Sequence, residues 1–189
     1  CELRVARFVF NSRIRIANLG TLKMNYSTIQ KDFFRESGKW LSTSEIWAKC
    51  INPNLHYIYV FRKCQQYPKK SFLGLFWRMV LRHHQIKYGI QIYPETQIGE
   101  GLYIGHWGFL AVNPGVVIGR NCNLSQGVSI AQTNRGKYKG TPTIGDEVWI
   151  GPNAVIVGGI KIGNNVIIAP NTYVTEDVPD YCMAMGNPC

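Results

Sequence analysis

Residues 144–168 read IGDEVWIGPNAVIVGGIKIGNNVII, with an aliphatic residue at every sixth position from Ile144 to Ile168. The same spacing runs back to residue 92 and on to residue 174, and glycine often follows the aliphatic residue directly. A period of six fits neither an amphipathic helix, which repeats every ~3.6 residues, nor an alternating strand, which repeats every ~2. The thirteen positions are Ile92, Ile98, Ile104, Leu110, Ile118, Leu124, Ile130, Ile144, Ile150, Ile156, Ile162, Ile168 and Val174.

This hexad predicts a prism of short parallel strands, in which each face contributes one inward aliphatic residue and each corner is a turn. Corner turns favour residues that tolerate positive φ, and asparagine is such a residue. Asn121, Asn153, Asn164–Asn165 and Asn171 stand where the prism needs corners. The pattern is typical of a left-handed parallel β-helix built from hexapeptide repeats.

The first half of the chain predicts helices. The stretch STIQKDFFRESGKW (27–40) offers Ser27 as an N-cap, and two short helices are expected at 43–51 and 54–66. The longest expected helix spans 70–86, with an apolar face of Phe72, Leu75, Phe76, Met79 and Val80. The predicted fold class is therefore α+β: an N-terminal helical region (24–87) followed by the β-helix domain (88–189). Residues 1–23, which precede Met24, are interpreted as a leader or upstream segment.

Charge is unevenly divided along the chain. Residues 1–90 hold 16 Lys or Arg against 4 Asp or Glu, whereas residues 91–189 hold 5 against 7. Such an asymmetry indicates either a basic surface that meets an anionic partner or a solvated helical face. The six cysteines are scattered, which argues against a disulfide framework and a zinc site and favours the cytoplasm.

The hexad is interrupted twice, and chemistry-bearing residues stand near both interruptions. We place two extra residues between 110 and 118, and eight between 130 and 144. His106 lies on a nearby corner. Its imidazole can take a proton from an alcohol; the alternative is that it only caps a turn. The loop 132–142 carries Arg135, Lys137 and Lys139, either as a clamp for a phosphorylated carrier or as a solvated excursion.

Residues 88–189 resemble the serine acetyltransferase branch of the hexapeptide acyltransferases. The motifs that carry the resemblance are IYPETQIGEGLYIGHWG (92–108), NLSQGVSIAQTNRGKYKGTPTIGDEVWIGPNAVIVGGIKIG (123–163) and GNPC (186–189). The resemblance implies a homotrimer, acetyl-coenzyme A as acyl donor without a metal, and active sites between subunits. It makes His106 the catalytic residue. The cofactor-binding residues expected on this basis are Ala131, Thr133, Arg135, Lys137, Lys139 and Gly151.

Three departures from the family concern the acceptor. Gly105 stands where the family has an aspartate, Gln91 replaces a second aspartate, and Gly140–Thr141 replaces an Arg-His pair. A zwitterionic serine would need such charges, because ions buried without partners are unfavourable. Two acceptors therefore stay open: serine or a related hydroxyl, and a neutral saccharide of a capsule or exopolysaccharide. A non-catalytic hexapeptide scaffold is the third alternative.

The expected acceptor-binding residues are Gln91, Trp107 and Asn113. For the basic helical region we expect no nucleic-acid partner. One hypothesis is peripheral contact with an anionic membrane by a cytoplasmic protein, through basic residues interleaved with aromatic ones. The alternative, which the sequence favours, is that the aromatic residues pack in a helical core. The residues concerned are Lys69, Lys70, Arg78, Arg82, Phe72, Phe76 and Trp77.

Overall fold

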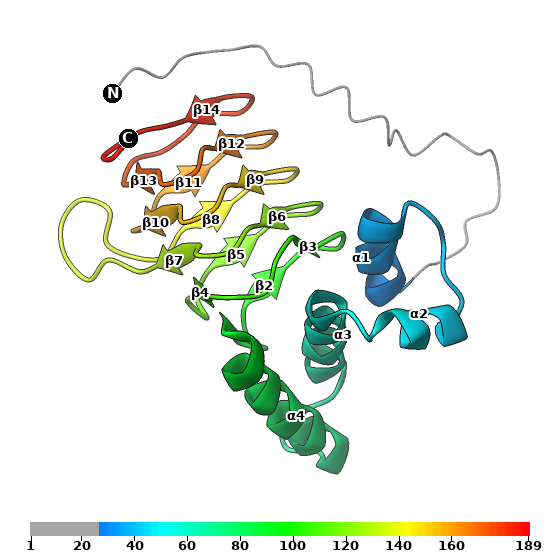
Figure 1. Cartoon of the computed structure of the whole chain (residues 1–189). Helices are drawn as coiled ribbons and strands as arrows, with labels where there is room; N and C mark the ends of the chain where they lie inside the picture. Colours follow the sequence, from blue (N-terminus) through cyan, green and yellow to red (C-terminus); the bar gives the residue numbers. More distant parts are fainter. Residues whose placement is uncertain (1–26) are drawn as a thin grey trace.

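The computed structural model describes residues 27–189, so the segment interpreted as a leader lies outside the described residues. Within them, four helices precede a series of short strands (Figure 1). The helices are α1 (Thr28–Ser37), α2 (Thr43–Lys49), α3 (Pro53–Gln66) and α4 (Phe72–Tyr88). No helix in this part of the chain combines the length and apolar character needed to cross a bilayer.

The strands wind into a parallel solenoid of about five turns with three faces (Figure 1). The first face is made of β1 (Ile90–Ile92), β4 (Leu110–Val112), β7 (Ser129–Ala131), β10 (Val155–Val157) and β13 (Tyr173–Val174). The second face holds β2 (Gln97–Ile98), β5 (Val117–Ile118), β8 (Thr143–Ile144) and β11 (Lys161–Ile162). The third holds β3 (Tyr103–Ile104), β6 (Asn123–Leu124), β9 (Trp149–Ile150), β12 (Ile167–Ile168) and β14 (Met183–Ala184).

The hexad prediction is confirmed. All thirteen predicted aliphatic positions are buried inside the solenoid. Asn121, Asn153, Asn165 and Asn171 have φ between 55° and 60°, the left-handed conformation expected at the corners. The predicted order of a helical region followed by a parallel β-helix of hexapeptide repeats is therefore correct.

The position predicted for the first interruption is wrong. Ile92 pairs with Val112, and Val112 pairs with Ile130, so Val112 and not Leu110 continues the stack on the first face. From Ile104 to Val112 is eight residues instead of six. The two extra residues therefore lie in the segment that carries His106, and not between 110 and 118. The error arose because Leu110 is also buried and also fits the spacing.

The helices begin where their capping residues predict. Ser27 forms a capping box with Gln30, and Ser42 and Ser71 accept hydrogen bonds from the first turns of α2 and α4. Asn52 caps α3, which has Pro53 in its first turn. Helix α4 begins at Phe72, two residues after its predicted start, and ends at Tyr88, two residues beyond its predicted end. The C-cap Gly89 has a φ of 68°, which allows the chain to turn into β1.

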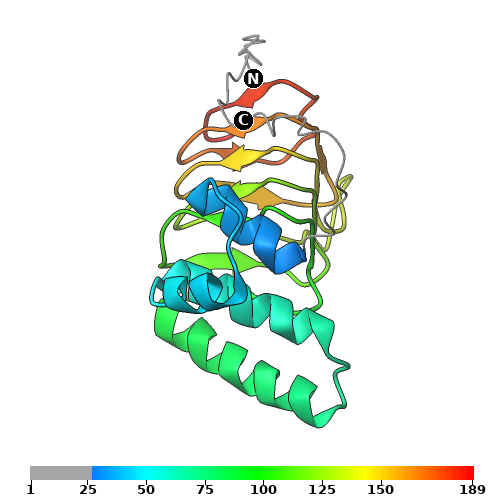
Figure 2. The same ribbon diagram turned by 90° about the vertical axis from the view of Figure 1, so that its right-hand side faces the viewer.

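A buried ion pair joins the helical region to the first turn of the solenoid. Asp32 of α1 and Arg62 of α3 lie 2.7 Å apart, and Arg62 also donates to the carbonyl oxygens of Ile98 and Gly99. Asp32 accepts from the backbone N–H of Leu102 at 2.9 Å. Figure 2 shows α1 lying along the side of the lower turns. Since every strong donor and acceptor here has a partner, the two regions are held in one arrangement.

The open edge of β1 is closed by side chains of two helices. The Tyr57 hydroxyl bonds both the N–H and the carbonyl oxygen of Ile92, at 3.1 and 3.0 Å. Gln85 of α4 donates to the same carbonyl oxygen at 3.1 Å. Figure 1 shows α3 and α4 at this end of the solenoid.

The apolar face predicted for the last helix does not form a core, which corrects our favoured interpretation of its aromatic residues. Phe72, Leu75, Phe76 and Met79 are exposed, whereas Gly74, Leu81, His84 and Gln85 are the buried residues of α4. Trp77 and Val80 are partly buried and pack against the core. The helix therefore contacts α3 through a different, more polar face than the sequence suggested.

Candidate active site

His106 lies on the corner between β3 and β4, in the turn lengthened by the two extra residues, and its side chain is exposed. Two helices hold this turn. Asn54 of α3 donates from Nδ2 to the Gly105 carbonyl oxygen at 3.2 Å, and the Gly108 N–H donates to the Tyr88 carbonyl oxygen at 3.0 Å. The sequence therefore places an imidazole in solvent on a backbone that is anchored on both sides.

Two large aromatic residues follow His106 in the same turn. Trp107 is 60% exposed and Phe109 is 84% exposed. Trp107 was predicted as an acceptor-binding residue, but Phe109 was missed because an aromatic residue next to a hexad position is expected to cover the solenoid. The pair provides flat apolar surface beside His106, the type of surface on which a sugar ring or another flat group packs.

The next turn of the solenoid places polar groups against this corner. The Gly127 N–H donates to the Phe109 carbonyl oxygen, and Gln126 lies next to Gly108. Gln126 Oε1 and Asn54 Oδ1 are buried and have no hydrogen-bond partner in the described part of the chain. Buried amide oxygens of this kind normally have a partner. Sequence reasoning missed both residues, because neither stands in a recognisable motif.

The loop 132–142 connects β7 to β8 and projects from the solenoid (Figure 1). It is a small hairpin, since Thr133 and Gly140 exchange both backbone hydrogen bonds at 2.9 Å. Arg135, Lys137 and Lys139 are all exposed on it, and Lys137 Nζ lies 4.8 Å from the centre of the Tyr138 ring. The three cations therefore lie on one short projection whose strands are hydrogen-bonded to each other.

Gly159 holds the base of this hairpin against the solenoid. The Gly159 N–H donates to the Tyr138 carbonyl oxygen at 2.7 Å. A Cβ at Gly159 would come within 2.8 Å of the Lys139 carbonyl oxygen, so a larger residue would push the hairpin away. The loop is thus seated by backbone contacts, which leaves its basic side chains available.

The first face of the solenoid separates His106 from the basic loop. His106 stands at the edge where the chain enters this face, and the loop leaves from the opposite edge. Crossing the face takes about five extended residues, or roughly 16 Å. Gln91 of β1 and Ala131 of β7 lie on this face. Within one chain, His106 and the basic loop, which are expected to act together, are therefore not in contact.

Asn113 lies at the opposite edge of the first face from His106, whereas Gly151, which follows β9, lies at the same edge as His106 but two turns further along. Asn113 stands at the loop edge of the first face, and its Oδ1 accepts from the Gly115 N–H at 2.9 Å. The Gly151 N–H donates to Ile168, and a Cβ at Gly151 would come within 2.8 Å of the Pro170 nitrogen. The observed contacts of Gly151 are thus those of close packing between turns.

Comparison with known proteins agrees with this geometry. A family model described as bacterial transferase hexapeptide (six repeats) matches residues 141–176. A serine acetyltransferase of Staphylococcus epidermidis strain RP62A is 37% identical over 111 residues, which is 59% of this chain and 52% of that protein. The chain is therefore similar to serine acetyltransferases over its hexapeptide repeats. It spans about half the length of the curated relatives it matches.

Solved serine acetyltransferases share the fold over most of the described chain. The Neisseria gonorrhoeae enzyme, solved in complex with serine, has a TM-score of 0.66 at 25% identity and covers 85% of this chain and 66% of its own. The Brucella abortus S19 protein, solved with coenzyme A, has a TM-score of 0.67 at 23% identity over 85% and 63%. The likeness includes the helices, since coverage exceeds the length of the solenoid.

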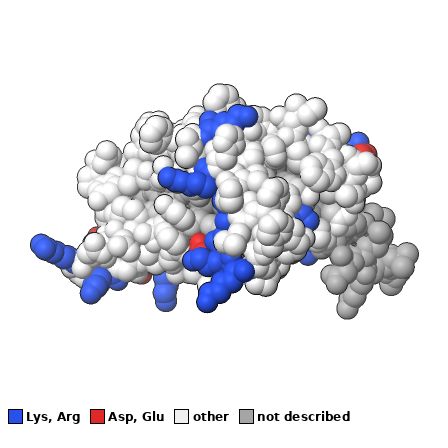
Figure 3. Space-filling model, turned by 90° about the horizontal axis from the view of Figure 1, so that it is seen from below, with Lys and Arg blue, Asp and Glu red and all other residues white. Residues whose placement is uncertain are grey.

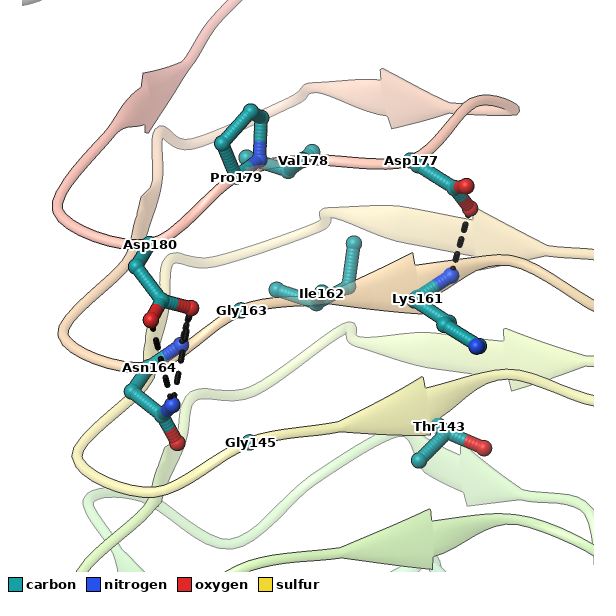
Figure 4. Close-up of a pocket in the computed structure, with 10 residues that line it drawn as sticks. All are labelled: Thr143, Gly145, Lys161, Ile162, Gly163, Asn164, Asp177, Val178, Pro179 and Asp180. Atoms are coloured by element: carbon teal, nitrogen blue, oxygen red, sulfur yellow. Dashed lines mark hydrogen bonds between the residues drawn. The ribbon is translucent and has the colours of Figure 1, made fainter.

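A hollow of ≈ 410 Å³ lies elsewhere on this serine acetyltransferase-like chain. Residues of β8, β11 and the segment 177–180 line it, so it opens on the second face (Figure 4). Its polar groups bond one another: Asp180 accepts from Asn164, and Asp177 accepts from the Lys161 N–H at 2.7 Å. None of the predicted site residues lines it.

The described residues offer little for metal or thiol chemistry. No group of three or more His, Cys, Asp or Glu side chains in residues 27–189 is arranged to hold a metal ion. Burial raises the pKa of the Cys50, Cys64 and Cys122 thiols to about 11. These thiols are therefore protonated near neutral pH, which makes them poor nucleophiles. His106 therefore stays the predicted catalytic residue.

Proposed function

We propose that the protein is an acetyl-coenzyme A-dependent O-acetyltransferase of the serine acetyltransferase type. The observation that carries the proposal is the exposed His106 on an interrupted, helix-anchored corner of a hexapeptide solenoid. The likeness to serine acetyltransferases supports the same chemistry.

The proposed mechanism is direct transfer. A ring nitrogen of His106 takes the proton of the acceptor hydroxyl while that oxygen attacks the thioester carbonyl carbon. The carbonyl π electrons move to its oxygen, and the tetrahedral intermediate then expels the thiolate of coenzyme A. The thiolate takes the proton back from His106, so the reaction ends with an acetyl ester and free coenzyme A. No acetylated side chain is required.

The basic loop is the proposed donor site. Coenzyme A carries phosphate groups, and Arg135, Lys137 and Lys139 offer exposed cations on one seated hairpin. Ala131 and Thr133 lie at the point where the loop leaves the first face. The Brucella abortus protein with the same fold binds coenzyme A, which supports this assignment. Gly151 is proposed to contribute only by letting adjacent turns pack closely.

The homotrimer is proposed from the resemblance to serine acetyltransferases, and the separation of His106 from the loop supports a site shared between two chains. Roughly 16 Å of the first face lies between them in one chain. A neighbouring subunit that lays its loop against the His106 corner would complete the site, so we propose that each site is built by two chains. Asn113 would then belong to the site that includes the loop of its own chain.

The acceptor is proposed to be serine or a related small hydroxyl compound, as in the Neisseria gonorrhoeae relative solved with serine. A neutral saccharide is the second candidate, and specific observations favour it. Gly105 and Gln91 bring no charge to the site, while Trp107 and Phe109 expose apolar surface beside His106. The unpaired oxygens of Asn54 and Gln126 are suited to accept hydrogen bonds from sugar hydroxyls.

The test is the release of free coenzyme A from acetyl-coenzyme A with L-serine and, separately, with sugars and oligosaccharides. We expect release with one acceptor class and a fall in kcat of about 10²–10⁴-fold for His106→Ala. Lys161→Ala, which changes an exposed lysine on the second face, serves as the control and should leave kcat unchanged.

Release with sugars alone would assign the protein to glycan O-acetylation, and release with serine alone to the serine reaction. Equal activity of His106→Ala and the wild type would contradict the mechanism. If coenzyme A release stays at the background rate with every acceptor, while the protein assembles normally, the non-catalytic scaffold becomes the better description.

A further inference from the structure

Helix α4 carries a row of apolar side chains on its solvent side. Phe72, Met79 and Ile86 are 84%, 73% and 71% exposed, and Leu75 and Phe76 are exposed beside them. These five residues, the outer stripe, lie within an arc of about 100° around the helix axis, so they share one face of the helix. The stripe runs along about 21 Å of helix. Exposed apolar rows of this length usually mark a surface that binds a partner.

Basic residues border the outer stripe. Lys69 and Lys70 precede the helix, Arg82 lies on one flank of the stripe and Lys87 on the other, and all four are exposed. Figure 3 views this end of the molecule and shows several Lys and Arg groups beside uncharged surface, with little acidic surface among them. Glu95 is the acidic neighbour, and it pairs with Arg78 at 2.9 Å and with Lys69 at 3.8 Å.

The charges decide which partner fits. Two copies of the chain that packed stripe against stripe around a two-fold axis would bring their Arg82 and Lys87 flanks together, and like charges repel. An anionic surface attracts the same flanks while it buries the stripe. An apolar row between basic flanks is the pattern of helices that lie in the interface of an anionic bilayer.

We propose that the outer stripe of α4 docks on an anionic membrane surface, with the helix parallel to the bilayer. This inference does not depend on the proposed acetyl transfer. Its consequence for the site is nevertheless direct: the last residue of α4, Tyr88, accepts a hydrogen bond from Gly108, two residues after His106. A docked α4 would hold the His106 corner at a fixed height close to the membrane surface.

Co-sedimentation of the full chain with vesicles tests the proposal. We expect binding to vesicles of phosphatidylcholine mixed with phosphatidylglycerol, weaker binding as salt is raised, and little binding to phosphatidylcholine alone. The variant Phe72→Ser/Met79→Ser should bind about tenfold more weakly or worse, because two large apolar groups are lost. Arg82→Glu should also bind more weakly.

Two variants on the solenoid are matched controls. Tyr181→Asn removes an exposed aromatic residue from a position of positive φ that asparagine accepts, and Lys161→Glu reverses an exposed charge on the second face. Both should bind like the wild type. Because the changed α4 side chains are exposed, each variant should also keep the wild-type unfolding transition, which is measured in parallel.

Three results would overturn the proposal. The first is equal binding to vesicles with and without phosphatidylglycerol, and the second is wild-type binding by Phe72→Ser/Met79→Ser. The third comes from sedimentation velocity without vesicles: if that variant has half the mass of the wild-type particle, a second copy of the chain covers the stripe.

Discussion

The solenoid and helix α4 each carry a regular row of apolar side chains, but only the row in the solenoid is buried. Ile92, Ile130 and Ile156 stack behind three walls of backbone, and their side chains are fully shielded from water. Phe72 and Met79 of α4 are as regularly spaced and point into solvent. The spacing in each case predicted the local structure correctly. It did not predict what lies against the row.

The difference has a physical origin. In a solenoid the element closes on itself, so the residues that repeat must face inward once the turns stack. A helix has no inside of its own, and its apolar face can be covered by the same chain, by another molecule or by lipid. In the solenoid, the sequence period alone therefore determines that the apolar row is buried. In α4, only tertiary contacts can bury it. Three measurements sharpen this contrast.

The largest expected effect comes from breaking the buried link between the two regions. Asp32→Ala leaves Arg62 buried without its carboxylate partner, and we expect a loss of about 3–5 kcal/mol in the free energy of unfolding. Urea denaturation followed by tryptophan fluorescence measures it. Lys31→Ala is the matched control, because its pair with Glu100 is partly exposed and is worth at most about 1 kcal/mol. Equal losses for the two variants would show that the buried pair does not hold the regions together.

The next test compares the two rows directly. Ile150→Ala removes apolar atoms from the stack of the third face and should lower the free energy of unfolding by about 2–5 kcal/mol. Met79→Ala removes a similar volume from the outer stripe and should change it by no more than about 0.5 kcal/mol. The same denaturation experiment measures both. A loss at Met79 comparable to that at Ile150 would mean that the stripe is already covered in solution.

The smallest effect concerns pH. Burial lowers the pKa of His84, and it lowers the pKa of His56, whose ring centre lies 4.4 Å from that of His84. The unfolded chain therefore binds protons first as the pH falls, so stability is complete above pH ~6.5 and declines as the pH drops toward the lowered pKa values. Denaturation midpoints on both sides of that pH should show the decline.

The variant His84→Asn isolates the cause. His84 Nδ1 lies 2.7 Å from the Val80 carbonyl oxygen, and an asparagine amide can donate to the same oxygen without titrating. The pH dependence should be smaller in this variant than in the wild type. An unchanged dependence would assign the effect to other groups.

The solenoid could be predicted in detail because one short rule repeats in it. The stacked aliphatic positions and the asparagine corners followed from the hexad itself, and the basic loop 132–142 followed from its second interruption. Leu110 and Val112 could each have been the stacked position of β4, and the sequence could not decide between them. Strand pairing decided, and it moved the extra residues into the turn of His106.

The contacts that position His106 could not be predicted, because they join residues far apart in the chain. Asn54 reaches Gly105 across 51 positions, and Arg62 reaches Asp32 across 30. Neither pair has a local pattern. Likewise, nothing in the spacing of Asn113 showed that it would turn away from His106 toward the loop.

The side chains that close the edge of β1 also determine how solenoids can meet. A parallel strand with free N–H and carbonyl groups is a template for the next strand, and a stack of open turns could in principle add further chains end to end. Tyr57 and Gln85 occupy the hydrogen bonds of Ile92 that an incoming strand would need. The helical region thus blocks the addition of a further strand at this end, and Tyr57→Phe combined with Gln85→Leu would free the hydrogen-bonding groups of Ile92.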